Sequence, residues 1–395
     1  MQLIQTDNHF DYIITGTGCA GLSLLLHILQ EPNLRDKSIL LVDNSLKEKN
    51  DKTWCFWEKE IGFLENLVCH SWEELIFNTD TESLTLVIAP FKYKMIRSID
   101  LYNYAKSRSL KKSKIKWLQA DVTAVGNENG QAFATVNNIT YYGKYVFNSI
   151  IFEKEQKAYQ IDTCYKLLQH FKGWVIETNE PHFDDKKATF MDFRVDQKDG
   201  CAFVYALPLS PTKALVEYTF FNKELIPQEK YDDFLKQYLK NQLGINEYSI
   251  LETENGVIPM TNHRFKKNEG NVINIGTAAG WTKGSSGFTF QFIQKNTFLM
   301  TESLVHNKAP IIKKSILENR YNLYDSTLLN VLYNNKMTGK DIFQQLFSKQ
   351  KPSSIFRFLD NNSSMKEDIK IMSSVPLNIF LPAALKEIYH AVTKK

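Results

Sequence analysis

The feature that most constrains the fold is a glycine pattern near the N-terminus, within DYIITGTGCAGLSLLLHIL at residues 11–29. The pattern is Gly16-x-Gly18-x-x-Gly21, preceded by a predicted buried strand and followed by a predicted apolar helix. In that context the first glycine permits a tight turn, and the second lets a pyrophosphate approach the backbone. The third lets helix and strand pack closely. The pattern therefore predicts a turn that binds a nucleotide.

The residues after this pattern extend the same prediction. A helix is expected over 19–29, and its free N–H groups and positive dipole end would face the phosphates. A second apolar strand, 38–43, ends in Asp43, whose carboxylate could accept the ribose hydroxyls. The alternative is a glycine-rich turn in another kind of α/β protein. This unit alone does not distinguish NAD from FAD.

A second strand, glycine turn and helix follow much later in the chain. NVINIGTAAG, residues 271–280, is predicted to be a strand that ends in a turn before another helix. A nucleotide domain that closes so late contains a large insertion, and this layout resembles the FAD-binding fold of the glutathione-reductase and hydroxybenzoate-hydroxylase type. The resemblance implies that Gly276, Thr277 and Gly280 lie against the flavin ribityl chain and pyrophosphate, although most such proteins have Asp in place of Thr277. The alternative is an unrelated turn.

Between the two turns, residues 174–222 alternate apolar and polar side chains in short runs separated by Gly, Pro and Asp. This alternation predicts antiparallel sheet. We therefore predict an α/β fold with a discontinuous FAD-binding Rossmann-like domain, an inserted antiparallel-sheet substrate domain and a helical C-terminal region. The predicted ranges are 1–165 with 255–300 for the first, 166–254 for the second and 301–395 for the third.

Two carboxylates in these runs are candidate functional groups. Glu217 is flanked by Leu, Val, Tyr, Thr and Phe in LVEYTFF, and burial among them would raise its pKa. Asp192 shares one face of its strand with Arg194 in MDFR. The alternatives are that alternation points these groups to solvent, or that Asp192 and Arg194 form a modest ion pair.

Composition restricts the function further. A net charge of +4 over 395 residues gives no argument for nucleic-acid binding. The five cysteines form no CxxC pair and no zinc-like pattern with histidines, which predicts a reduced, metal-free protein. The N-terminus lacks signal-peptide features, and no apolar run approaches the ~20 residues of a membrane span. We expect a cytoplasmic protein that is not integral to a bilayer.

Seven stretches, in one order along the chain, resemble the lycopene cyclase family of carotenoid biosynthesis in its bacterial form. They are GTGCAGLSL (16–24), DKTWCFWE (51–58), YKMIRSIDLYNY (93–104), MDFR (191–194), YALPLSPTKALVEYTFF (205–221), ENGVIPM (254–260) and GTAAGWTKGSSGFTFQFIQ (276–294). Gly-Thr at the late turn is common in this family. Relatives often have Lys-Pro-Ser where this chain has Lys283-Gly284-Ser285, so the loop after the turn departs from the family pattern.

The resemblance implies an isomerase-like flavin enzyme that closes the linear ends of lycopene into the β-rings of β-carotene without net redox change. It would use reduced FAD, with NADPH as the reductant. The family places an essential acid in the motif that holds Glu217, which makes Glu217 the expected proton donor. Asp192 and Glu254 are further acids that could orient substrate, stabilise charge or accept the departing proton. Arg97 resembles the arginine that flavoproteins of this fold place near the dinucleotide.

This chemistry explains why a buried carboxyl is needed. An alkene is a very weak base, so ring closure requires a neutral acid, and a carboxyl in an apolar pocket stays protonated at neutral pH. The resulting cation could be stabilised by an anionic reduced flavin and by aromatic faces. Trp54, Phe56 and Trp57 are candidates for such faces, with ordinary core packing as the alternative.

Two other functions stay open at this point: a redox flavoenzyme of the same fold, such as an NADPH-dependent hydroxylase or prenyl-chain reductase, and a non-catalytic carrier. Because lycopene lies in the bilayer, a cyclase would contact the inner membrane face peripherally. In the C-terminal stretch 380–395 one predicted helical stripe offers a docking face, and the alternative is that it packs on the protein itself. The stripe consists of Leu381, Ala384, Leu385, Ile388 and Val392.

Overall fold

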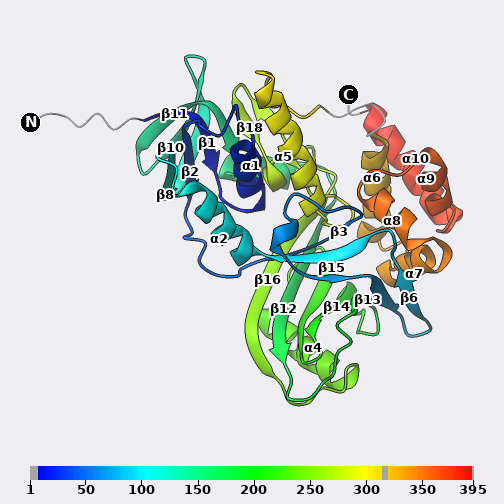
Figure 1. Ribbon diagram of the computed structural model, residues 1–395. Helices are drawn as coiled ribbons and strands as arrows, with labels where there is room; N and C mark the ends of the chain where they lie inside the picture. Colours follow the sequence, from blue (N-terminus) through cyan, green and yellow to red (C-terminus); the bar gives the residue numbers. More distant parts are fainter. Residues whose placement is uncertain (1–7, 314–318, 394–395) are drawn as a thin grey trace, which may run out of the picture.

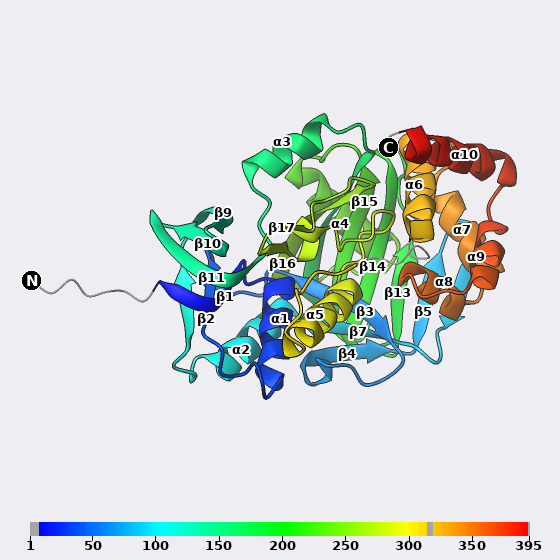
Figure 2. The same ribbon diagram turned by 90° about the horizontal axis from the view of Figure 1, so that it is seen from above.

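The computed structural model describes residues 8–313 and 319–393, which form three sheets and a C-terminal group of helices (Figures 1 and 2). The first sheet has a parallel core in the order β18-β11-β1-β2-β8. These strands are β1 (His9–Thr15), β2 (Ile39–Asp43), β8 (Ile115–Gln119), β11 (Ile139–Asn148) and β18 (Val272–Asn274). Parallel strands that are buried on both faces typically have continuous runs of apolar residues, and ILLVD in β2 is such a run.

Helices and strands cover the two faces of this sheet. One face carries a core shared with α1 (Cys19–Gln30), α2 (Ser98–Ser109) and α5 (Phe290–Val305). The other face is covered by β9 (Val122–Glu128) and β10 (Gln131–Val136), which extend antiparallel from β11. The short β17 (Asn268–Glu269) completes the edge beside β18. The predicted strand–turn–helix units at both glycine patterns are present.

The second sheet has seven strands in the order β16-β12-β15-β14-β13-β5-β6. Its strands are β5 (Glu74–Asn78), β6 (Ser83–Val87), β12 (Lys166–Glu177), β13 (Lys187–Asp192), β14 (Cys201–Ser210), β15 (Lys213–Asn222) and β16 (Ser249–Thr261). All pairs are antiparallel except β13 with β5. Two strands come from residues 74–87, outside the predicted range 166–254. The edge strand β16 also runs past residue 254, because it pairs with β12 along its whole length.

The two faces of this second sheet have different coverings. The helix α4 (Gln228–Asn241) packs on one face, against Val204, Val216 and Tyr218. The opposite face packs against a small third sheet and the C-terminal helices. The third sheet has the order β3-β7-β4, with β3 (Thr53–Glu58), β4 (Val68–Trp72) and β7 (Lys92–Arg97). This opposite face is where the acidic site lies.

The C-terminal helices form a separate group at the side of the molecule away from the first sheet, coloured orange to red in Figures 1 and 2. They are α6 (Asn319–Tyr333), α7 (Gly339–Lys349), α8 (Pro352–Leu359), α9 (Met365–Met372) and α10 (Leu377–Thr393). The remaining helix α3 (Glu153–Ile161) precedes β12. Within the ranges described, no helix is both long and apolar enough to cross a membrane.

A buried lysine ties this helical group to the loop after the late glycine turn. The Lys283 ammonium lies 2.8 Å from a carboxylate oxygen of Asp325 in α6 and donates to Asn361 at 2.8 Å. It also lies over the rings of Tyr321 and Phe358. The side chain of Lys283 is fully buried, so the ion pair is shielded from water. The loop at 283–285 is thus fixed against the C-terminal helices.

Candidate functional site

The first glycine turn has the geometry that a nucleotide site requires. Gly16 has φ +91°, and a methyl group added there would lie 2.0 Å from the Ser149 hydroxyl oxygen. A methyl group at Gly21 would lie 2.2 Å from the carbonyl oxygen of Gly16, which shows how closely helix and strand pack. At Gly18, by contrast, an added methyl group would meet nothing within 4 Å. The open side of Gly18 is where a phosphate could reach the backbone.

The late glycine turn meets the first one in space. It forms the short helix η2 (Gly276–Ala279), in which Gly276 has φ +61°, and ends at Gly280 with φ +69°. A methyl group added at Gly276 would lie 3.0 Å from the β-carbon of Ala20 in α1. Thr277 is partly exposed on this turn. The two turns, distant in sequence, therefore border one region at the start of α1.

Asp43 lies at the end of β2, next to the first turn. One carboxylate oxygen accepts hydrogen bonds from the backbone N–H of Thr17 at 2.6 Å and from its hydroxyl at 3.1 Å. The other accepts from the N–H of Ser45 at 2.9 Å and lies 3.3 Å from the Lys47 ammonium. In this structure Asp43 thus fixes the glycine turn, and its contact with a ribose stays a prediction.

Several polar atoms close to these turns have no partner within the described chain. They include the buried Oγ of Ser286 and Oε1 of Gln169. Gln169 reaches the loop before α5, since a methyl group added at Gly287 would lie 2.1 Å from its Oε1. Buried polar groups normally have a hydrogen-bond partner, so orphaned ones beside an open glycine turn fit a polar cofactor such as FAD.

The acidic part of the site is built on three neighbouring strands of the second sheet. Glu217 in β15 and Glu254 in β16 flank the central strand β12 and both pair in register with Gly173. A methyl group at Gly173 would lie 3.3 Å from Cγ of Glu254 and 3.4 Å from the β-carbon of Glu217. Because Gly173 has no side chain, the two carboxyl groups can approach each other across the strand between them.

Burial and mutual repulsion keep this pair of carboxyl groups from both being charged. Burial, and then the charge of Glu254, raise the pKa of Glu217 to about 8, against a hydrogen bond from the Thr219 hydroxyl at 2.8 Å that lowers it. Burial also raises the pKa of Glu254, whose carboxylate accepts a hydrogen bond from Thr53 at 2.7 Å. The two side chains also share a hydrogen bond. The pair therefore holds a proton at neutral pH.

Glu217 keeps part of its surface accessible although its carboxyl is enclosed by protein. Its neighbours are Cys55, Tyr93 and Tyr205, and burial raises the pKa of each of these groups well above its ordinary value, with the charge of Glu217 adding to the effect. We therefore attribute the raised pKa of Glu217 mainly to its low-dielectric surroundings.

A cavity of about 80 Å³ adjoins the pair, between the second and third sheets. Thr53, which binds Glu254, and Leu215, which contacts Gly173, are among its lining residues. Arg97 also lines it and donates to Glu252 at 3.0 Å. The predicted contact of Arg97 with the dinucleotide stays a prediction, since its observed partner belongs to β16.

Asp192 lies on the other face of the sheet, away from Glu217 and Glu254. It is fully buried and accepts two hydrogen bonds from the Arg194 guanidinium, at 3.0 and 2.7 Å. Tyr238 of α4 donates to it at 2.9 Å. The structure thus forms the ion pair that sequence offered as the alternative, and the position of Asp192 gives no support to its predicted catalytic role.

Some of the site was not visible in the sequence. Gly173 is not among the predicted site residues, although a glycine inside a strand pattern is a signal of close approach. The three aromatic candidates are divided between two cores: Trp54 and Phe56 pack near Phe290, whereas Trp57 stacks on Phe356. The aromatic groups beside Glu217 are instead Tyr93 and Tyr205, which come from β7 and β14.

One cysteine, for which the sequence showed no zinc-like pattern, lies beside a histidine and an aspartate in space. Cys164, Asp162 and His263 have potential ligand atoms within 4.8 Å of one another. However, Asp162 and His263 are directly hydrogen bonded at 2.6 Å, whereas two ligands of a tetrahedral ion stand roughly 3.4 Å apart. As placed, the cluster is a hydrogen-bonded group and not a formed metal site.

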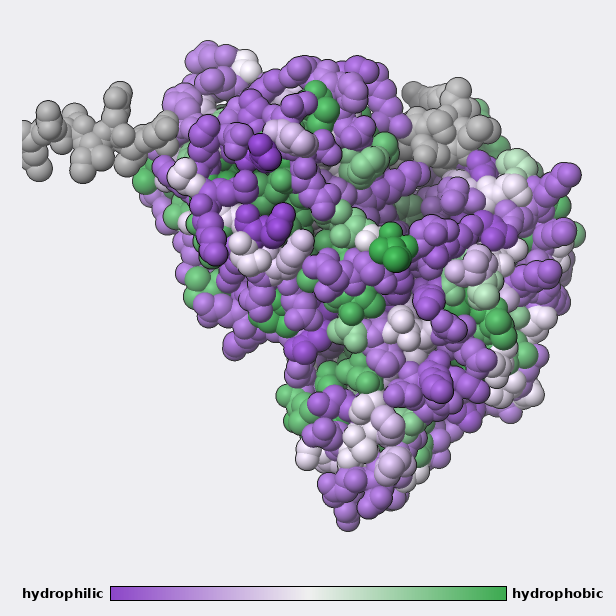
Figure 3. Space-filling view, in the orientation of Figure 1, coloured by the Kyte–Doolittle hydropathy of each residue, from purple (hydrophilic) through white to green (hydrophobic). Residues whose placement is uncertain are grey.

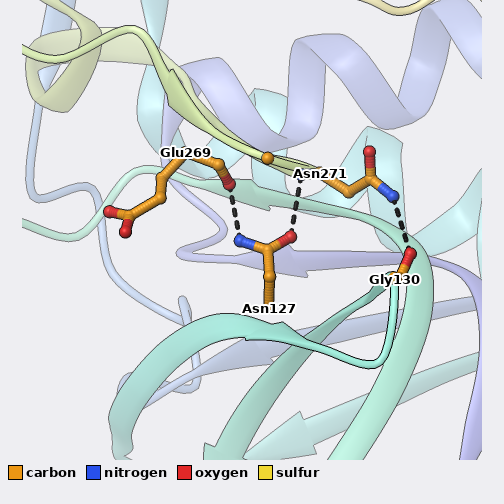
Figure 4. Close-up of a pocket in the computed structure, with 5 residues that line it drawn as sticks. Asn127, Gly130, Glu269 and Asn271 are labelled. Atoms are coloured by element: carbon orange, nitrogen blue, oxygen red, sulfur yellow. Dashed lines mark hydrogen bonds between the residues drawn. The ribbon is translucent and has the colours of Figure 1, made fainter.

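A larger hollow of about 390 Å³ lies elsewhere, at the turn between β9 and β10 (Figure 4). There the amide of Asn127 donates to the Glu269 carbonyl at 2.6 Å and accepts from the Asn271 N–H at 2.8 Å. Asn271 in turn donates to the Gly130 carbonyl at 3.1 Å. These hydrogen bonds join the β9–β10 turn to the β17–β18 edge of the first sheet.

The fold, with its two glycine turns, is of the FAD-binding flavoprotein type. Among solved structures, the chain is similar to a geranylgeranyl bacteriochlorophyll reductase-like protein from Thermoplasma acidophilum, with a TM-score of 0.67, 12% identity and coverage of 97% of this chain and 99% of that one. A flavin-dependent brominase has a TM-score of 0.60 at 11% identity, and the match covers 92% of this chain and 98% of the brominase. A flavoprotein/dehydrogenase from Cytophaga hutchinsonii has a TM-score of 0.58 at 10% identity, and the match covers 93% of this chain and 100% of that protein. These likenesses confirm the predicted fold class.

Sequence comparison identifies the family. The profile of the lycopene cyclase protein family matches residues 11–384, so the chain belongs to the lycopene cyclase family. It is 27% identical to lycopene beta-cyclase from Pantoea ananas over 262 residues, which are 64% of this chain and 63% of that relative. It is 44% identical to lycopene beta-cyclase from a Paracoccus strain over 55 residues, 14% of each chain. The family resemblance found in the sequence is confirmed.

Proposed function

We propose that the protein is a lycopene β-cyclase that closes the linear ends of lycopene by acid-initiated, redox-neutral chemistry. The observation that carries this proposal is the carboxyl pair of Glu217 and Glu254, which shares a proton near a small cavity whose apolar part includes Met95 and Leu215. Protonating an alkene requires an acid that is neutral at working pH and close to apolar substrate, and this pair supplies one.

The pair accounts for both proton transfers. Glu217 donates its proton to the terminal alkene, which leaves a tertiary carbocation that the neighbouring double bond attacks to close the ring. The ring cation then loses a proton, which the Glu254 carboxylate accepts to leave the β-ring alkene. The pair begins and ends with one shared proton, so no oxidant or reductant is consumed. Thr219 stabilises Glu217 while it is charged, since its hydroxyl donates to the carboxylate at 2.8 Å.

The surroundings protect and stabilise the cation. Tyr93 and Tyr205 are neighbours of Glu217, and an aromatic face would contribute ~0.5–2 kcal/mol to a nearby cation. The apolar side chains of Leu215 and Met95 exclude water, which would trap the cation as an alcohol.

The glycine turns would hold FAD, with Gly16, Gly18 and Gly21 at the pyrophosphate and Gly276 to Gly280 opposite them. Reduced FAD, formed with NADPH, would supply negative charge near the developing cation. Ser286 and Gln169 offer the unpartnered polar atoms that such a group would bind. Because its substrate dissolves in lipid, the enzyme would also make peripheral contact with a membrane.

Co-expression in a host that accumulates lycopene tests this function. We expect β-carotene on chromatography, and unchanged lycopene would contradict the proposal. A redox flavoenzyme of the same fold would instead consume NADPH or oxygen in proportion to product, whereas the cyclase needs only catalytic reduction. Measuring NADPH consumed per ring formed separates these two alternatives.

A further inference from the structure

The outer side of helix α10 is apolar and exposed. Its large apolar side chains recur on one stripe and are 44–68% exposed: Leu377, Leu381, Leu385, Ile388, Tyr389 and Val392. The sequence alternative, in which this stripe packs on the protein itself, is therefore wrong. The helix is held from its other side, where Ala383 is buried and the Glu387 carboxylate accepts hydrogen bonds from Tyr165 and Asn330, each at 2.7 Å. Its apolar stripe is thus fixed facing outwards.

The preceding helix adds to this apolar surface. In α9 the side chains of Met365, Ile369 and Met372 are 53%, 60% and 36% exposed, and their spacing puts them on one face. Both helices lie at the outer edge of the molecule, away from the nucleotide sheet (Figures 1 and 2). The face seen in Figure 3 is mostly hydrophilic, with scattered apolar patches.

The charges of α9 and α10 are arranged asymmetrically. All their acidic groups are engaged with the protein: Glu367 pairs with Arg357, Asp368 is buried against Arg320, and Glu387 is buried. The Arg357 guanidinium, foremost, lowers the pKa of Glu367 to about 2, so it stays paired at any physiological pH. Lysines 366, 370 and 386 are exposed, and no partner is found for them in the described chain. The surface therefore presents apolar side chains with uncompensated positive charge.

We propose that this α9–α10 surface docks on an anionic lipid bilayer. An exposed apolar face flanked by lysines is the pattern of helices that lie in a membrane interface. The inference deepens the proposed function, since it names the surface through which the enzyme would reach a lipid-soluble substrate. The same apolar cluster that contains Ala383 of α10 also contains Leu215, next to Glu217 and Gly173. Docking here would place the acidic site at the end of a continuous apolar layer.

Flotation of the whole flavin-loaded protein with vesicles tests the proposal. We expect binding to phosphatidylcholine vesicles that contain phosphatidylglycerol, and weaker binding at high salt. The triple change Leu381→Ser, Leu385→Ser and Ile388→Ser should weaken binding at least tenfold. The matched control, Leu110→Ser, Ile161→Ser and Leu225→Ser, changes one isoleucine and two leucines elsewhere that are 55–83% exposed, against 44–57% for the test set, and should bind as the wild type does.

A second variant tests the contribution of positive charge to binding without disturbing the folded protein. Changing Lys366, Lys370 and Lys386 to Glu alters no packed side chain, and should reduce binding to anionic vesicles by at least fivefold, the factor expected from ~1 kcal/mol for a single lysine. Absence of wild-type binding, or undiminished binding by both variants, would overturn the proposal. The proposal would also be overturned if the wild type were a dimer that does not bind vesicles and the serine variant were a monomer, because the surface would then be a dimer interface. Because vesicle binding needs no lycopene, a protein that binds vesicles but forms no rings would refute only the proposed function.

Discussion

The substitution Glu217→Gln should abolish cyclisation while the protein stays folded and retains flavin. Glutamine has the size of glutamate but no proton that it can donate to an alkene. Glu217 lies in β15 of the second sheet, whereas the nucleotide turns belong to the first sheet, so cofactor binding should not depend on it. The prediction thus separates the proton donor from the cofactor site.

The expected magnitude follows from the raised pKa. A carboxyl with a pKa of about 8 is about 90% protonated at pH 7, whereas at its ordinary value of 4.5 it would be about 0.3% protonated. Burial, followed by the charge of Glu254, thus makes the acid form the dominant one. General acid catalysis typically contributes 10²–10⁴-fold to a rate, so we expect the Gln variant to lose at least ~100-fold in turnover.

The pH dependence gives a sharper test than loss of activity alone. Turnover should fall as pH rises through the pKa of Glu217, because the deprotonated form cannot donate. Glu254→Gln removes the proposed proton acceptor, so its turnover should be lower at every pH. It also removes a charge that raises the pKa of Glu217, so the decline of the remaining turnover should move to lower pH. Thr219→Val removes a hydrogen bond that lowers the pKa, and should move the decline to higher pH. General structural damage would not produce opposite shifts.

The assay is conversion of detergent-solubilised lycopene, followed by chromatography across pH, with flavin content measured by absorbance. Full activity in Glu217→Gln, or shifts of the two neighbouring variants in one direction, would refute the reasoning.

The stability of the protein provides a second measurement. Because folding raises this pKa, the folded state binds more protons than the unfolded state between pH 4.5 and about 8, and wild-type stability falls over that window. Glu217→Gln should therefore raise the melting temperature at pH 8 more than at pH 5.

Further substitutions test the remaining geometry. Gly18→Ala adds a methyl group where nothing lies within 4 Å, so the melting temperature of the apoprotein should not change. Its flavin affinity, measured by titration, should fall at least tenfold. Gly16→Ala, at φ +91°, should instead destabilise the apoprotein itself. Gly173→Ala should separate the two carboxyl groups, lower turnover and move its decline to lower pH, and an unchanged pH profile would contradict the pairing. Lys283→Met leaves Asp325 buried without its cation and should cost about 3–5 kcal/mol in urea unfolding, which Asp325→Leu added to it should largely restore.

Sequence alone determined the features that depend on neighbouring residues. The two strand–glycine–helix units could be predicted because each signal lies within a few residues of the chain. The antiparallel runs could be predicted because alternation of side chains reflects burial of one face. Glu217 could be chosen because its own strand neighbours are apolar, and the family resemblance pointed to the same residue.

Only the tertiary structure decided which of these residues meet. The order β15-β12-β16 brings Glu217 and Glu254 together across Gly173, and no local pattern encodes the order of strands in a sheet. Asp192 has a strand context as apolar as that of Glu217, yet the pleat turns it towards α4 and Arg194. The α10 stripe is equally apolar whether it packs inwards or faces out, and the bonds of Glu387 fix it outwards. Strand order, the facing of side chains and the covering of surfaces are long-range outcomes, because they depend on contacts between residues far apart in the chain.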